Sequence, residues 1–147
     1  MSVHIAGPPR RVGRPHYDRR LLRARAQRLL RALGHEKAEL SLTLCDDVEM
    51  AALNEQYRGN AGATDVLSFS LLEGAHAAFR GDLLGEVAIG IDVAARQARR
   101  GRRSLDAELT RLLIHGVLHL LGHDHVRREE ARRMRAEERC LLRELTS

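Results

Sequence analysis

The residues with the clearest chemical meaning are the histidines of one short segment, residues 115–125, which reads HGVLHLLGHDH. His115 and His119 are four positions apart, so on a helix both imidazoles lie on one face, one turn apart. Gly122 can end that helix, and the chain can then turn so that His125 returns to the same point. Three imidazoles suit a zinc ion and leave its fourth position open for water, as in catalytic zinc sites. The segment therefore predicts one zinc ion held by His115, His119 and His125.

The spacing of these histidines, H-x3-H-x5-H, is also that of the metzincin proteases. Those enzymes carry a glutamate directly after the first histidine as general base, whereas this chain has Gly116. The segment thus favours a zinc hydrolase with a different kind of substrate. Two other residues of the segment each have two interpretations. His123 is either a further neighbour of the ion or a solvent-exposed residue. Asp124 either orients a ligand imidazole or is part of the turn.

A histidine pair of this kind needs a long helix and a scaffold that holds it in place. Leu40, Leu42 and Leu44 alternate with polar residues, as in a half-buried strand. Asp46 with Glu49 is typical of a helix start. We expect helices at about 18–33, 46–59, 92–100, 105–121 and 127–145, and strands at 40–44, 65–71 and 85–91.

This order predicts an α+β fold of the α/β type, in which one small sheet packs with about five helices. The metal site is expected at the end of the long central helix. All three prolines lie between residues 6 and 16. We therefore expect residues 1–17 to form a flexible basic arm and residues 18–147 to form a single metal-dependent hydrolase domain.

Composition and charge exclude several classes of protein. The chain has 147 residues and a net charge of +5, and residues 1–34 hold nine arginines but only one acidic residue. The remainder holds 16 basic and 19 acidic residues, which argues against a uniformly basic nucleic-acid coat. The longest apolar stretch is too short and too polar to span a membrane, and we see no secretory signal. Two distant cysteines are expected to be reduced thiols of a cytoplasmic protein.

Three stretches resemble the YbeY family of bacterial endoribonucleases and rRNA maturation factors. The histidine segment resembles the family signature H-G-x-L-H-L-x-G-[YH]-D-H. Residues 53–70, LNEQYRGNAGATDVLSFS, resemble L-N-x-x-Y-R-x-x-x-x-P-T-D-V-L-S-F-P, and residues 83–90, LLGEVAIG, resemble L-G-D-I-x-I. Ala63 and Ser70 stand where the family pattern has proline, and Glu86 stands where it has aspartate.

The resemblance implies an endoribonuclease specific for single strands that uses one zinc ion, held by His115, His119 and His125. It implies a role in late maturation of small-subunit rRNA, at the 16S 3′ end, and in ribosome quality control. The implied partners are single-stranded RNA or rRNA and the small ribosomal subunit with its proteins. A cytoplasmic monomer with no membrane partner is expected.

The implied catalytic residues are His115 and Arg58, onto which the family's conserved arginine maps. A guanidinium can clamp two oxygens of a phosphodiester as negative charge develops in the transition state. The alternative for Arg58 is a solvated residue at a helix end. A metal-bound hydroxide can attack phosphorus directly or deprotonate the RNA 2′-OH, and the sequence does not choose between them.

Arginines before the long helix are candidates for phosphate contacts. Arg96, Arg99 and Arg100, followed by Arg102 and Arg103, form one cluster. A second cluster, in the arm and directly after it, consists of Arg10, Arg11, Arg14, Arg19 and Arg20. Either cluster binds RNA phosphates or is simply a solvated face. Because the chain has two Phe, two Tyr and no Trp, base stacking is not expected to dominate RNA binding.

Two other functions stay open: a non-catalytic, zinc-stabilised RNA-binding factor of ribosome assembly, and a metalloprotease.

Overall fold

The computed structural model describes residues 2–7, 16–70, 83–122 and 128–146. Its strands are β1 (Ser2–Ala6), β2 (Glu39–Cys45), β3 (Val66–Ser70) and β4 (Leu83–Gly90). They form a sheet in the order β1-β2-β4-β3. The β1–β2 and β2–β4 pairs are parallel, and β3 is antiparallel to β4. Among the described strands, β3 is therefore an edge strand.

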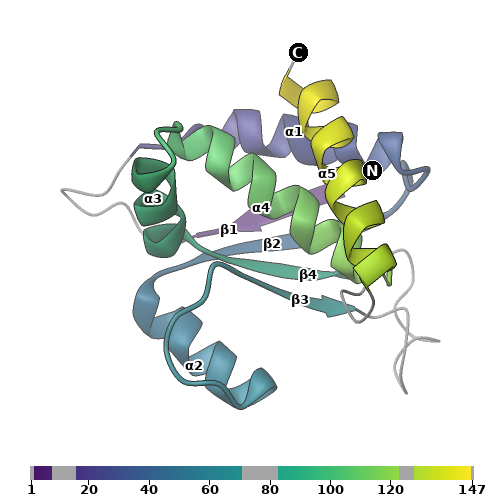
Figure 1. The fold of residues 1–147 in the computed structure, drawn as a ribbon. Helices are drawn as coiled ribbons and strands as arrows, with labels where there is room; N and C mark the ends of the chain where they lie inside the picture. Colours follow the sequence, from purple (N-terminus) through teal and green to yellow (C-terminus); the bar gives the residue numbers. More distant parts are fainter. Residues whose placement is uncertain (1, 8–15, 71–82, 123–127, 147) are drawn as a thin grey trace.

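Helices cover both faces of this sheet (Figure 1). Helices α1 (Arg19–Ala32), α4 (Leu105–Leu120) and α5 (Arg128–Thr146) lie over one face, while α2 (Asp47–Arg58) lies below the other. Helix α3 (Ile91–Arg100) follows β4 directly and packs beside α4. The predicted fold class, one small sheet packed with five helices, is confirmed for the described ranges.

Helix α4 forms the centre of the core because it contacts the sheet, α1, α3 and α5. Nearly every apolar residue of α4 is buried, from Leu109 at 1% exposure to Leu118 at 0%. His115 and His119 lie on the stripe of α4 that reaches the surface, and both are half-buried. None of the helices in the described ranges is long and apolar enough to cross a membrane.

The helix boundaries follow local signals in the sequence. Asp18 caps α1 by accepting a hydrogen bond from the backbone N of Leu21 at 3.1 Å. Asp46 and Glu49 form the predicted capping box at the start of α2. Gly59 ends α2 with φ of 67°, a left-handed conformation that favours glycine. This end directs the chain into the loop that leads to β3.

The N-terminal segment requires a correction. Residues 2–6, which were expected in a flexible arm, instead form β1 and pair with β2. Val3 is buried and Ile5 packs against the core, so apolar side chains on one face hold this strand to the sheet. The pattern is only five residues long and precedes the prolines, which is why periodicity alone did not reveal it. Residues 8–15 of the expected arm lie outside the described residues.

Candidate functional site

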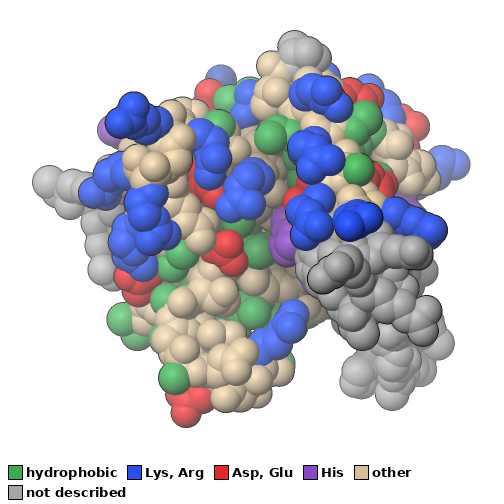
Figure 2. All heavy atoms as spheres, viewed as in Figure 1, with side chains coloured by type: hydrophobic (Ala, Val, Ile, Leu, Met, Phe, Trp, Pro, Cys, Tyr) green, Lys and Arg blue, Asp and Glu red, His purple; other side chains and the backbone are tan. Residues whose placement is uncertain are grey.

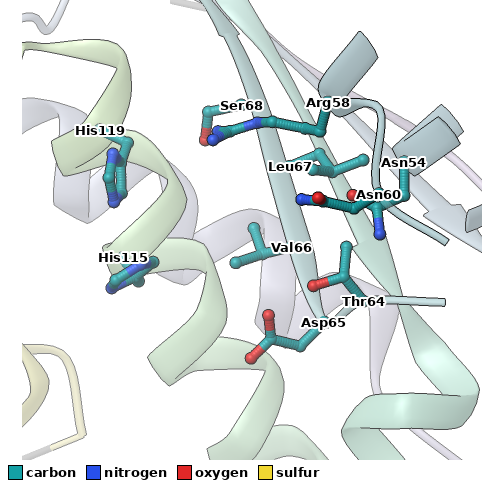
Figure 3. Close-up of a pocket in the computed structure, with 10 residues that line it drawn as sticks. All are labelled: Asn54, Arg58, Asn60, Thr64, Asp65, Val66, Leu67, Ser68, His115 and His119. Atoms are coloured by element: carbon teal, nitrogen blue, oxygen red, sulfur yellow. The ribbon is translucent and has the colours of Figure 1, made fainter. Parts of the chain in front are cut away.

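A polar pocket of about 380 Å³ lies between α4, the edge strand β3 and the end of α2 (Figure 3). Helix α4 supplies two histidines, α2 and the loop after it supply polar side chains, and β3 forms the wall between them. The described lining residues are Asn54, Arg58, Asn60, Thr64, Asp65, Val66, Leu67, Ser68, His115 and His119.

The two helical histidines lie together as their spacing predicts. Their ring centroids are 4.7 Å apart, with the rings tilted by 59°. The predicted third ligand, His125, lies outside the described residues, as do His123 and Asp124. Within the described ranges there is no group of three or more side chains suited to a metal ion. The predicted three-histidine site therefore stays a prediction, and the structure describes two of its three members.

Gly116 has a structural reason to be glycine. A Cβ at this position would lie 2.6 Å from Cγ1 of Val87 and 3.1 Å from Cγ2 of Val66. The Ser68 hydroxyl donates to the Gly116 carbonyl at 2.8 Å, which ties α4 to β3 at this point. The metzincin glutamate would have to occupy this same position, where the sheet leaves no room for a side chain. Gly116 thus sets the close approach of the histidine helix to the pocket wall.

Arg58 lies in the pocket although it precedes His115 by 57 positions in the chain. It is the last residue of α2, and its side chain extends across β3 towards the histidine face of α4 (Figure 3). Asn54, which is 7% exposed, donates to the Gly62 carbonyl at 2.9 Å and so holds the loop after α2. The structure therefore brings the two predicted catalytic residues, Arg58 and His115, into one pocket.

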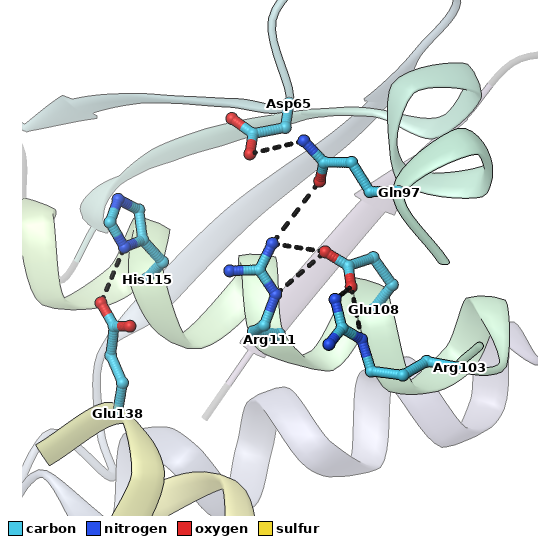
Figure 4. A network of polar contacts seen from close by, with 7 residues as sticks. All are labelled: Asp65, Gln97, Arg103, Glu108, Arg111, His115 and Glu138. Carbon is cyan, nitrogen blue, oxygen red and sulfur yellow. Dashed lines mark hydrogen bonds and ion pairs between the residues drawn. The ribbon is translucent and has the colours of Figure 1, made fainter. Parts of the chain in front are cut away.

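Glu138 of α5 contacts the site directly and was not expected from the sequence. Its Oε1 lies 2.7 Å from Nδ1 of His115 (Figure 4). The exposed side-chain fractions are 17% for Glu138 and 27% for His115, so the contact is partly shielded from water. Glu138 is one of many charged residues in α5, and nothing in that pattern distinguishes it. Only the packing of α5 against α4 brings it to His115.

A network of hydrogen bonds links the pocket wall to the interior (Figure 4). Gln97 Nε2 donates to Oδ2 of Asp65 at 3.3 Å, and Arg111 Nη2 donates to Oε1 of Gln97 at 3.5 Å. Arg111 also pairs with the fully buried carboxylate of Glu108. Asp65 is thereby connected to both α3 and α4.

The buried carboxylate at the end of this network is held by two guanidinium groups. Burial alone raises the pKa of Glu108, but the hydrogen bonds and charges of Arg111 and Arg103 outweigh it and hold that pKa below its ordinary value. Arg103 reaches Glu108 Oε2 at 2.8 Å. The hydrogen bond to Glu108 likewise raises the pKa of Arg111.

The predicted RNA-binding arginines lie on α3 and not in the described lining of the pocket. Arg96 forms two hydrogen bonds with the Asp47 carboxylate, at 2.9 and 3.1 Å. These hydrogen bonds are the main cause of the raised pKa of Arg96. Arg99 and Arg100 are exposed at the end of α3. None of these three is among the described residues that line the pocket. Figure 2 shows Lys and Arg side chains (blue) on both sides of the exposed histidine atoms (purple).

By fold and site, the protein is an α+β protein with a histidine-lined polar pocket at one edge of its sheet. A family model described as Endoribonuclease YbeY matches residues 14–146. The chain therefore belongs to the YbeY family.

Named relatives agree with this family. A protein called Endoribonuclease YbeY from Anaeromyxobacter sp. (strain Fw109-5) is 52% identical over 124 residues, which are 84% of this chain. The chain spans 63% of that relative's length. A protein of the same name from Geobacter metallireducens is 41% identical over 143 residues, covering 95% of this chain and 92% of the relative.

A solved structure agrees with the fold. The solution structure of TM1509 from Thermotoga maritima matches with a TM-score of 0.66. The match covers 97% of this chain and 88% of the other, at 24% identity. At that identity the likeness is one of fold.

Proposed function

We propose that this protein is a metal-dependent endoribonuclease that cleaves single-stranded RNA with one zinc ion. The observation that carries the proposal is that Arg58, His115 and His119 share one pocket. A guanidinium that can bind phosphate and two imidazoles that could bind a metal ion are groups suited to the cleavage of a phosphodiester. The name that its relatives carry, Endoribonuclease YbeY, supports RNA as the substrate class.

The donor set fits zinc in its chemistry. Neutral imidazoles one helical turn apart, with a carboxylate on Nδ1 of one of them, are the ligands and the support that zinc sites use. His115 and His119 would hold the ion together with His125 from the segment after α4. When bound, zinc supplies a Lewis acid and lowers the pKa of its water ligand to around 7.

Protein side chains would bind the phosphodiester and stabilise its transition state. Arg58 would bind two non-bridging oxygens of the scissile phosphodiester and stabilise the charge that develops there. Asn54 and Gly59 fix the end of α2 and thus the starting point of the Arg58 side chain. We further propose late maturation of small-subunit rRNA in the cytoplasm as the role, with the small subunit and its proteins as partners and with the protein acting as a monomer.

A cleavage assay combined with metal analysis tests this function. Protein freed rigorously of contaminating nuclease is loaded with zinc and incubated with single-stranded and duplex RNA. Wild type is expected to bind one zinc and to cut the single strand, and His119→Ala is expected to lose both properties. RNA cleavage by metal-free His119→Ala at the wild-type rate would contradict the proposal. Zinc binding without cleavage would favour the non-catalytic assembly factor.

A further inference from the structure

We infer that Glu138 is a positioning residue that fixes the tautomer of His115, so that Nε2 is the nitrogen that carries the ring lone pair a metal ion would need. The consequence for metal binding rests on the proposed function, whereas the tautomer of His115 is a property of the metal-free protein. The observation behind it is the 2.7 Å contact between Glu138 Oε1 and His115 Nδ1.

The contact determines which nitrogen carries the proton. An ionised carboxylate has no hydrogen to give, so it can only accept. Nδ1 of His115 must therefore be the donor, and in the neutral ring the lone pair then belongs to Nε2. The two nitrogens lie on different sides of the ring, so Nε2 points away from α5 (Figure 4). In water a neutral imidazole prefers the opposite tautomer, and the carboxylate has to reverse that preference.

The position of the carboxylate is set by packing. Met134 is 0% exposed, Leu141 is 6% and Leu145 is 2%, so one face of α5 packs against the core. Glu138 lies four residues after Met134 and three before Leu141, which places it on that same face. Its side chain therefore meets α4 rather than solvent, at the level of His115.

The same contact also has an energetic effect. A carboxylate on Nδ1 makes the imidazole a better ligand and holds its ring in one orientation. Removal of such a partner typically weakens metal binding about 10–100-fold. Helix α5 would then be part of the site rather than only a cover for the core.

The test compares the full chain with Glu138→Ala, Glu138→Gln and, as a control, Glu55→Gln. Glu55 is an exposed carboxylate on α2. Long-range ¹H–¹⁵N spectra of metal-free protein, recorded at about pH 9, above the ordinary histidine pKa, report the tautomer. The His115 signals are assigned by their disappearance in His115→Gln. Zinc affinity is then measured by competition with a chromophoric chelator.

We expect wild type and Glu55→Gln to show a protonated Nδ1 at His115. Glu138→Ala should shift towards a protonated Nε2 and bind zinc about 10–100-fold more weakly. Glu138→Gln should keep a protonated Nδ1, because its amide oxygen still accepts, and should lose less zinc affinity than Glu138→Ala.

Three results would overturn the inference: a protonated Nε2 in wild type, an unchanged tautomer in Glu138→Ala, or unchanged zinc affinity in that variant. An equal loss of zinc affinity in both Glu138 variants, accompanied by equal loss of urea resistance, would mean a packing role only and would also overturn it. The spectra need neither zinc nor RNA. A wild type with the expected tautomer and zinc affinity that fails to cut RNA would therefore support the inference and contradict only the proposed function.

Discussion

Ser68 of the edge strand donates a hydrogen bond to the carbonyl of Gly116, one residue after the first histidine of the pocket, at 2.8 Å. This bond and the missing side chain at residue 116 together set how closely α4 approaches β3. The distance between the histidine face and the opposite wall, where Arg58 reaches across, depends on that approach. The pocket is therefore as much a product of helix–sheet packing as of the residues that line it.

Gly116→Ala should destabilise the fold by about 1–3 kcal/mol, because its Cβ would overlap Cγ1 of Val87. Urea unfolding followed by circular dichroism measures the change in stability. Val87→Ala removes the atom that is in the way, so the double variant should be more stable than the sum of the two single effects predicts. Simple additivity in this cycle would show that the clash is not the cause.

Arg58→Ala should lower the rate of RNA cleavage by about 100-fold or more while zinc affinity stays at the wild-type value, since removal of one transition-state donor costs about that much. Arg58→Lys keeps the charge but cannot grip two oxygens, so it should restore only part of the rate. Single-turnover cleavage together with a zinc titration checks both expectations. A wild-type rate for Arg58→Ala would leave Arg58 as a solvated helix-end residue.

Arg99→Ala and Arg100→Ala should weaken binding of single-stranded RNA and flatten its salt dependence. For every phosphate that a variant no longer binds, the slope of log affinity against log salt should fall by about 0.7. Arg96→Ala is the comparison, because the Asp47 carboxylate already holds that guanidinium, and it should change the slope less. Fluorescence anisotropy at several salt concentrations gives the slopes. Equal slopes for Arg99→Ala, Arg100→Ala and wild type would mean that this end of α3 does not bind RNA.

Glu108→Gln should destabilise the protein by about 1.5–3 kcal/mol at neutral pH, because it removes the charge of a buried carboxylate that two partly exposed arginines hold by hydrogen bonds. The pKa of Glu108 is lowered in the folded protein, so its contribution is present above the unfolded value of about 4.3 and is lost as the pH falls below it. The stability difference between wild type and Glu108→Gln should therefore shrink on acidification. Urea unfolding at neutral and acidic pH tests this.

The exposed carboxylate of Glu55 provides the control for that experiment. Glu55→Gln makes the same change of charge on the surface of α2 and should stay within about 0.5 kcal/mol of wild type. If the difference in stability between wild type and Glu108→Gln stayed constant across the pH range, the ion pairs of Glu108 with Arg111 and Arg103 would not be the cause of that difference.

Local patterns were enough to predict most elements of this fold. Helix ends depend on local contacts. The Asp18 and Asp46 side chains bond backbone N–H groups three residues away, and Gly59 ends α2 by its own conformation, so these signals do not depend on the rest of the fold. The strand β1 was missed because five residues carry too little periodicity, and its stability comes from pairing with β2, more than thirty residues away.

The sequence by itself determined that His115 and His119 share a helical face, because a four-residue spacing fixes that geometry in any α-helix. It also indicated Arg58, through a resemblance that covers the motif around it. Only the tertiary structure decided that Arg58 faces the two histidines, that Gly116 lies against Val87, and that Glu138 reaches Nδ1 of His115. The physical reason is that each of these contacts joins two elements separated along the chain, and their meeting depends on how α2, α4 and α5 pack around the sheet.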